Sequence, residues 1–168
     1  RAGVTRISLG VQSAHDCELQ SLHRPHTFEQ AKEAVEAARA AKLKNLSLDL
    51  IYGRPEQDMD SWKDSVEQVL SLEPEHLSCY GLKVEEGTPL FAMKDTAGLP
   101  GDEEQADMYL QTVEFLKQYG YEQYEISNFA KPGYESRHNL RYWLTRPYIG
   151  FGPGAHSDFG GRRYSFVR

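Results

Sequence analysis

Residues 46–51 read LSLDLI, an apolar stretch that is closed by Gly53 and Pro55. Short apolar runs that end at turn residues are typical of buried β-strands. Residues 6–11, which read RISLGV, and residues 76–82 are runs of the same kind. We therefore expect buried strands in these three segments.

Helical patterns lie between these strands. Apolar residues recur at helical spacing over 27–42, where Thr27 and Gln30 have the spacing of a capping box. Asp60 is the expected N-cap of a second helix, which ends before Pro74. Each of the first two strands is thus followed by an amphipathic helix.

The clearest helical pattern covers residues 102–120. Asp102 and Gln105 again stand at capping-box spacing, and Gly120 occupies the position after the helix, where glycine is favoured. A turn at 85–89 precedes this helix. The expected helix therefore has a recognisable start and end.

Two shorter strands are expected at 123–127 and 148–151. The order is strand, helix, strand, helix, strand, loop, helix, strand. This order indicates an α/β fold with a parallel sheet and right-handed crossovers. Part of a (β/α) barrel and an open doubly wound sheet both fit the pattern.

The 168 residues carry a formal charge of −6, which argues against a broad nucleic-acid interface. No apolar run approaches the roughly 20 residues of a membrane span. Cys17 and Cys79 form no CxxC pattern, so neither a disulfide framework nor an all-cysteine metal site is expected within the chain. Together these features indicate an intracellular protein, and the start at Arg1 suggests a segment of a longer one.

Ligands of parallel α/β proteins bind at the carboxyl ends of the strands, so polar residues there are candidates. Gln12 ends the first strand and either binds a ligand or caps the next loop. Asp49 lies inside an apolar strand, where an unpaired carboxylate costs several kcal/mol. It therefore needs donors, either an arginine, backbone amides or ligand hydroxyls; the purely structural alternative is an ion pair with Arg24 or Arg6.

The loops after the first and third strands carry further charged residues. Arg24 lies between the first strand and the first helix, and its guanidinium fork suits a carboxylate or a phosphate. The alternative for such an arginine is simple solvation. Glu85 and Glu86 follow the third strand, and a structural role in the turn is the favoured interpretation for both.

The last forty residues are rich in glycine and aromatic side chains. His138 lies near Tyr142 and Trp143, and a histidine in such surroundings either ligates iron or packs in an aromatic cluster. The glycines of 150–154 lack phosphate-loop spacing and are expected to let the backbone approach a ligand closely. His156 follows them and could line that ligand.

Seven segments form a recognisable set: 6–13 (RISLGVQS), 22–26 (LHRPH), 48–53 (LDLIYG), 85–89 (EEGTP), 121–130 (YEQYEISNFA), 138–143 (HNLRYW) and 152–156 (GPGAH). Together they resemble the radical S-adenosylmethionine (SAM) family around oxygen-independent coproporphyrinogen III oxidase. The last four narrow the resemblance to the HemW branch of haem chaperones.

This resemblance implies the second half of a radical SAM partial (β/α) barrel over 1–127. Residues 128–168 would then close the barrel and lead to a further C-terminal domain. It also implies that Gln12, Arg24 and Asp49 bind SAM. Asp49 would then take the ribose hydroxyls, and Arg24 the methionyl carboxylate.

The HNxxYW pattern of the HemW branch implies haem binding. His138 becomes a candidate axial ligand of the haem iron, with Tyr142 and Trp143 beside it, and His156 is expected near the SAM or cluster pocket. The implied function is binding of SAM, a [4Fe–4S] cluster and haem, with delivery of haem to acceptor proteins in the cytoplasm.

Two alternatives stay open. The oxidase branch, which decarboxylates coproporphyrinogen III in porphyrin biosynthesis, resembles the same barrel but lacks the pattern at 138–143. A generic α/β barrel domain that binds a nucleotide-like ligand would be favoured if Gln12, Arg24 and Asp49 pointed away from a common pocket.

The sequence departs from the family pattern in two places. The usual GLPGQ is GRPEQ at 53–57, so a charged pair replaces leucine and glycine on a loop near the expected site. The CxxxCxxC motif that holds the [4Fe–4S] cluster is absent and is expected upstream of Arg1. We therefore expect the chain alone to be inactive in radical chemistry.

Overall fold

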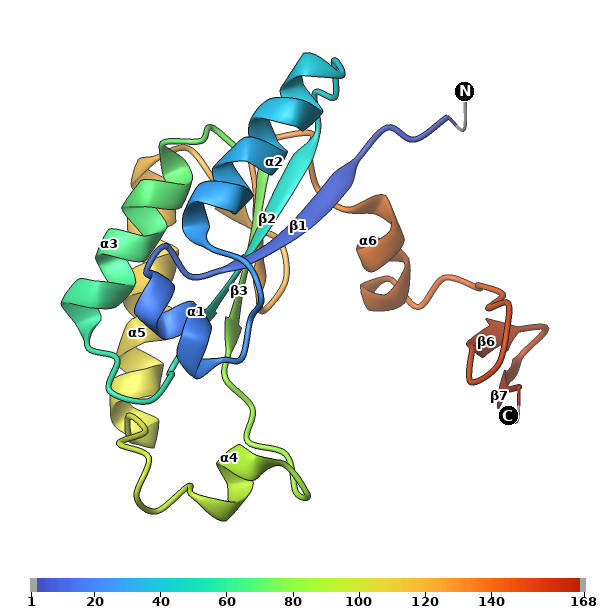
Figure 1. Ribbon diagram of the computed structural model, residues 1–168. Helices are drawn as coiled ribbons and strands as arrows, with labels where there is room; N and C mark the ends of the chain where they lie inside the picture. Colours follow the sequence, from blue (N-terminus) through green and yellow to red (C-terminus); the bar gives the residue numbers. More distant parts are fainter. Residues whose placement is uncertain (1–2, 167–168) are drawn as a thin grey trace. The chain divides into compact units, whose positions relative to one another are not determined.

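The computed structural model describes residues 3–166, and these divide into two compact units. The first unit runs to Tyr134, and the second begins at Glu135. The first unit contains a five-stranded sheet in the order β1-β2-β3-β5-β4 (Figure 1). The predicted end of the barrel after residue 127 stays a prediction.

The three predicted parallel strands are confirmed. They are β1 (Ile7–Gln12), β2 (Leu46–Tyr52) and β3 (His76–Gly81). Both neighbouring pairs run parallel, β1 against β2 and β2 against β3. The register of β1 shifts between Leu9 and Gln12, so the last residue of β1 lies opposite Leu50.

Helices connect these strands as the pattern predicts. The helices of the first unit are α1 (Asp16–Ser21), α2 (Phe28–Ala40), α3 (Met59–Leu70), α4 (Pro89–Ala92) and α5 (Asp102–Gln118). The short helices α1 and α4 were not predicted, since neither has a full period of apolar residues. Helices α2 and α3 are the crossovers between the parallel strands.

The predicted start of α5 at Asp102 is confirmed, and the predicted capping residue is right at α2 but wrong at α3 and α5. The Thr27 hydroxyl accepts a hydrogen bond from the Gln30 backbone amide at 3.3 Å, and the Gln30 side-chain oxygen accepts one from the Thr27 backbone amide at 3.0 Å. Asp58, not Asp60, caps α3, because it alone has the extended backbone that an N-cap needs. In α5 the cap is Gly101, whose amide donates to Glu104.

The predicted parallel strand at 123–127 is wrong. The chain turns back within this segment, and the result is a hairpin of β4 (Glu122–Gln123) and β5 (Asn128–Ala130). Strand β5 pairs antiparallel with β3. Local hydrogen bonds stabilise this turn, such as the one from the Gln123 side-chain amide to the Ile126 carbonyl. A strand pattern in the sequence does not reveal such bonds.

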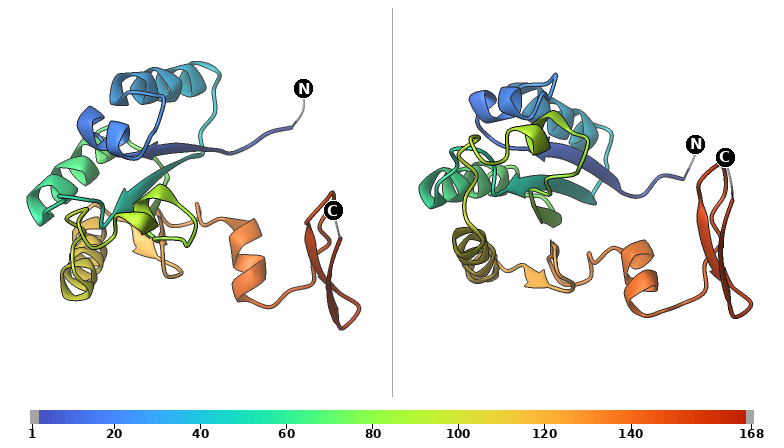
Figure 2. Two further views of the ribbon diagram at one scale, coloured as in Figure 1. Left: turned by 60° about the horizontal axis from the view of Figure 1, so that its bottom comes forward. Right: turned by 90° about the horizontal axis from the view of Figure 1, so that it is seen from below.

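Helices α2, α3 and α5 lie on one side of the sheet, as the two views of Figure 2 show. Alternate strand residues point toward them and form a single buried core with the apolar helix faces. The core includes Leu46, Leu48 and Leu50 of β2, which are fully buried. The other face of the sheet is polar.

The second unit consists of α6 (Arg137–Trp143) and a hairpin of β6 (His156–Phe159) and β7 (Arg162–Ser165). The strand predicted at 148–151 is wrong, because only Tyr148 pairs, in a single bridge to Asp158. No helix within residues 3–166 is long and apolar enough to cross a membrane.

Candidate functional site

The polar face of the sheet carries a row of hydrogen-bonding side chains across three strands. They alternate with core residues along each strand, which the predicted uniformly buried strands did not anticipate. They are Ser8 of β1, Ser47 and Asp49 of β2, and His76 and Ser78 of β3. The period-two alternation in LSLDL was the signal that could have identified this face.

Asp49 is held by serine hydroxyls. Ser78 donates to Asp49 Oδ1 at 2.8 Å, Ser8 donates to both carboxylate oxygens at 3.0 and 3.1 Å, and Ser47 donates to Oδ1 at 3.4 Å. The alternative of an ion pair with Arg24 or Arg6 is wrong, since Asp49 forms none within the described residues. The serines supply the donors because parallel pairing places their strands on both sides of β2.

The two oxygens of Asp49 are used unequally. Oδ1 accepts from three hydroxyls, whereas Oδ2 accepts only from Ser8. A carboxylate has about four acceptor positions, so Oδ2 keeps room for another donor. Asp49 can therefore accept a hydrogen bond from a ligand hydroxyl without losing its serine partners.

His76 of β3 extends this hydrogen-bond network from Ser47, its neighbour on β2. Its Nδ1 lies 2.7 Å from Ser47 Oγ, and its Nε2 lies 2.7 Å from the Tyr124 hydroxyl. Burial, with a smaller contribution from the nearby Arg6, lowers the pKa of His76 to about 3. The imidazole is therefore neutral at physiological pH, and it joins Ser47 to the hairpin turn as a rigid link.

Gln12 lies at the end of β1 in an unusual conformation. Its φ of 68° is left-handed, a strained region for a side chain other than glycine. A Cβ atom placed on Gly10 would lie 2.6 Å from Gln12 Nε2, so the amide folds back over that glycine. Gly10 alternates with Ser8, which places the amide on the polar face that carries Asp49. Within residues 3–166 the amide has no hydrogen-bond partner.

Arg24 is exposed on the loop after α1. Its backbone amide donates to the Leu19 carbonyl at 2.9 Å, which ends α1, but its guanidinium forms no ion pair within residues 3–166. No contact joins it to Gln12 or Asp49 in that part of the chain. The structure thus brings two of the three predicted SAM residues to one face and leaves Arg24 unengaged.

The segment 53–57, which departs from the family pattern, places its arginine in the protein interior. Arg54 is fully buried and pairs with Glu18 of α1, while its Nε donates to the Ile51 carbonyl at 2.9 Å. Ser13 and Ser61 also donate to the Glu18 carboxylate. Burial lowers the pKa of Arg54, and Glu18 opposes that shift. The pair therefore ties the loop after β2 to the helix that follows β1.

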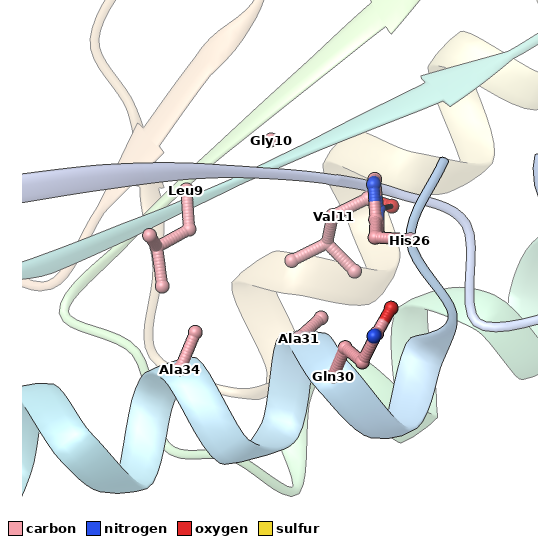
Figure 3. A pocket seen from close by; sticks show the side chains of 7 residues that line it. All are labelled: Leu9, Gly10, Val11, His26, Gln30, Ala31 and Ala34. Carbon is pink, nitrogen blue, oxygen red and sulfur yellow. Dashed lines mark hydrogen bonds between the residues drawn. The ribbon is translucent and has the colours of Figure 1, made fainter. Parts of the chain in front are cut away.

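A small cavity of about 180 Å³ lies between β1 and α2 (Figure 3). Its walls are mostly apolar, and His26 Nε2 lies 3.2 Å from the Val11 carbonyl at one end. Leu9 and Val11 point into it from the helix-facing side of β1. The cavity is thus separated by the strand from the polar face with Asp49 and is not part of that site.

The second unit brings His138 and Tyr142 together. His138 Nε2 lies 2.9 Å from the Tyr142 hydroxyl, and the rings meet edge to face at 5.0 Å. Tyr142 also packs edge to face against Tyr148 at 4.6 Å. Trp143 is about half exposed and forms no ring contact within the described chain.

His138 also lines a cavity of about 550 Å³ on α6. The other lining residues are basic or apolar, and they are Arg137, Leu140, Arg141, Leu144 and Arg146. The arginines are therefore the charged side chains among these lining residues.

His156 is exposed at the start of β6. A Cβ atom on Gly150 would lie 2.3 Å from the His156 carbonyl oxygen, and the Gly150 amide donates to Ser157 Oγ at 3.0 Å. Gly150 thus permits close approach of the chain to itself, where approach to a ligand was expected. A role for His156 beside SAM stays a prediction.

The described residues do not fit an iron–sulfur cluster. Cys17 is exposed on α1, and Cys79 is buried in β3, where burial raises its thiol pKa. Within residues 3–166 no group of three or more histidine, cysteine or acidic side chains could hold a metal ion.

Comparison with known proteins shows which sequences the chain is similar to. Residues 1–69 match the model of the radical SAM superfamily. Heme chaperone HemW of Bacillus subtilis is 43% identical over 164 residues, which cover 96% of this chain and 43% of that protein. Heme chaperone HemW of Escherichia coli is 43% identical over 156 residues, or 93% of this chain and 41% of that protein.

The fold has a solved counterpart. The coproporphyrinogen III oxidase HemN of Escherichia coli, a radical SAM enzyme, superposes with a TM-score of 0.75 over 92% of this chain and 39% of that one, at 24% identity. This match confirms the predicted fold. The chain spans less than half the length of the curated relatives it matches. Residues 1–69 match the radical SAM superfamily, and almost the whole chain is similar in sequence to HemW proteins, as the motifs predicted.

Proposed function

We propose that the protein containing this chain is a haem chaperone of the HemW type, which binds SAM and haem and delivers haem to acceptor proteins in the cytoplasm. The observation that carries this proposal is the pairing of His138 with Tyr142 in a chain about 40% identical to proteins named heme chaperone HemW. A [4Fe–4S] cluster would be held by residues other than those described.

The SAM site of this proposal lies on the polar face of the sheet. Asp49 would accept from the ribose hydroxyls through Oδ2, the oxygen with spare acceptor capacity. The Gln12 amide, which has no partner within residues 3–166, would bind a polar group of SAM at the end of β1. Arg24, exposed on the neighbouring loop, would pair with the methionyl carboxylate.

The haem site of this proposal centres on His138. Its Nε2 lies 2.9 Å from the Tyr142 hydroxyl, and in the tautomer in which Nε2–H donates to that oxygen, Nδ1 would be available to iron. A hydrogen bond at the second ring nitrogen fixes the orientation of an imidazole ligand and raises its basicity. When bound, haem would supply an iron that imidazole can ligate, and Tyr142 would hold the His138 ring in place. Trp143 would cover one face of the porphyrin.

Haem titration tests the proposal. The full-length protein should give a Soret shift on titration with haem, and His138→Ala should abolish the histidine-dependent part of that spectrum. His23→Ala is the matched control, because His23 is another exposed histidine, and should leave the spectrum unchanged. An unchanged spectrum for His138→Ala would remove His138 from the haem site.

The competing function is oxygen-independent oxidation of coproporphyrinogen III, which the fold shared with HemN favours. Reduced full-length protein with its cluster should be incubated with SAM and coproporphyrinogen III. The chaperone proposal expects no protoporphyrinogen beyond the level without SAM. Sustained protoporphyrinogen formation would replace the chaperone proposal with the oxidase.

A further inference from the structure

The charges of the chain are divided unequally between its two units. Residues 1–134 contain thirteen basic and twenty-three acidic side chains, whereas residues 135–168 contain six arginines and two acidic side chains. The short second unit is therefore strongly basic within an acidic protein. A local excess of arginine of this kind favours an anionic ligand.

Three of these arginines gather at the cavity on α6. Arg137, Leu140, Arg141 and Leu144 follow the spacing i, i+3, i+4 and i+7, which puts them on one face of the helix. Arg146 joins them from the segment after the helix, where its amide donates to the Arg141 carbonyl at 2.8 Å. The cavity thus combines a basic part with an apolar part.

The guanidinium groups are available for a ligand. The ion pairs within residues 3–166 include none of Arg137, Arg141 and Arg146, and all three side chains are exposed. Arg141 is partly fixed, since its Nη2 donates to the Pro147 carbonyl at 2.6 Å and leaves other N–H groups unused. Arginine binds carboxylates through two parallel hydrogen bonds, which makes a carboxylate the best-matched anion.

We propose that Arg137, Arg141 and Arg146 bind the propionate carboxylates of the tetrapyrrole whose iron His138 ligates. The inference rests on the proposed function and adds the group that recognises the acidic edge of the ligand. Haem is a flat apolar ring with two carboxylates on one edge, and the cavity offers a histidine, two leucines and three arginines. Its volume of about 550 Å³ lies within the usual range of roughly 300–1,000 Å³ for ligand pockets.

The test compares haem with haem dimethyl ester, in which both carboxylates are blocked. Affinities are measured by Soret titration of the full-length protein and of the triple variant Arg137→Gln/Arg141→Gln/Arg146→Gln. Arg162→Gln/Arg163→Gln is the control, because it removes arginines of the same unit that do not line the cavity. Circular dichroism checks that each variant is folded, and Arg141→Lys tests charge without the planar fork.

The proposal expects wild-type protein to bind haem at least tenfold more tightly than its ester. The triple variant should lose that preference and bind both alike, the control should keep it, and Arg141→Lys should fall between. Equal binding of haem and ester by wild type, with a spectrum that still depends on His138, would overturn this inference alone. Failure of wild type to bind either ligand would overturn the proposed function as well.

Discussion

Replacement of Glu18 by glutamine should destabilise the protein more than replacement of its partner Arg54 by leucine. The Arg54 side chain is 1% exposed and the Glu18 side chain 15% exposed, so the pair is almost fully withdrawn from water. Glu18→Gln leaves the arginine buried and charged, with its Nη2 already lacking a hydrogen-bond partner within the described chain. Removal of one member of a buried ion pair costs about 3–5 kcal/mol.

Arg54→Leu, which restores the leucine of the family pattern, should be milder. The Glu18 carboxylate keeps two hydroxyl donors, from Ser13 and Ser61, and some access to water. We expect a loss of about 1–3 kcal/mol, as for a buried polar group left partly unsatisfied. The double variant Glu18→Gln/Arg54→Leu should be at least as stable as Arg54→Leu alone, because no buried charge remains.

Urea denaturation measures these differences. With a slope of about 2 kcal/mol per M, a loss of 3 kcal/mol lowers the midpoint by about 1.5 M at unchanged slope. The control is Glu29→Gln, which breaks an exposed pair with Lys32 and should change stability by less than about 0.5 kcal/mol. A Glu18→Gln midpoint at or above that of Arg54→Leu would refute the argument that Arg54 depends on its partner.

Three further effects on stability are expected. The pKa of His76 is lower in the folded chain, about 3, than its usual 6.5, so the stability it contributes is present above pH 6.5 and is lost as the pH falls toward 3. Between pH 7.5 and 5.5 this loss is about 1.4 kcal/mol, and urea midpoints of His76→Gln should lack it. Thr112→Val should cost about 1–3 kcal/mol in the same assay, because it leaves the buried indole N–H of Trp62 without its acceptor at 2.7 Å, whereas Thr112→Ser should not. Lys42 directly follows the C-cap of α2 at a φ of 63°, so Lys42→Gly should increase the free energy of unfolding by about 0.5–1 kcal/mol and raise the thermal midpoint; a lower midpoint would contradict the strain at this position.

Much of the fold follows from local patterns. The apolar runs at 6–11, 46–51 and 76–82 form the three parallel strands, because each must be buried and each is followed by a segment that turns. The capping box at Thr27 is a contact over three residues, so its side chains need no distant partner. The cap of α3 was misplaced because two aspartates, Asp58 and Asp60, compete there, and the backbone conformation decides between them. The cap of α5 was missed because Gly101 has no side chain that marks it as a cap.

The candidate site was predicted in part. The sequence showed that Asp49 needed donors, since a carboxylate inside an apolar strand is expensive to bury. It did not show which groups donate, because the serines at 8 and 78 reach Asp49 only once β1 and β3 pair with β2 on either side. The position of the Gln12 side-chain amide over Gly10 likewise depends on the left-handed backbone at Gln12, which residue spacing does not predict.

The sequence by itself therefore determined the resemblance to HemW and HemN, the parallel strands, most of the helices and the choice of candidate site residues. These depend on motifs and on periodicities that act within one turn or one strand. Only the tertiary structure decided that the serines satisfy Asp49, that Arg54 is buried against Glu18, and that residues 122–130 turn back as an antiparallel hairpin. The physical reason is separation along the chain: the bonds to Asp49 join residues 41 and 29 positions apart, and such contacts exist only after the strands have paired.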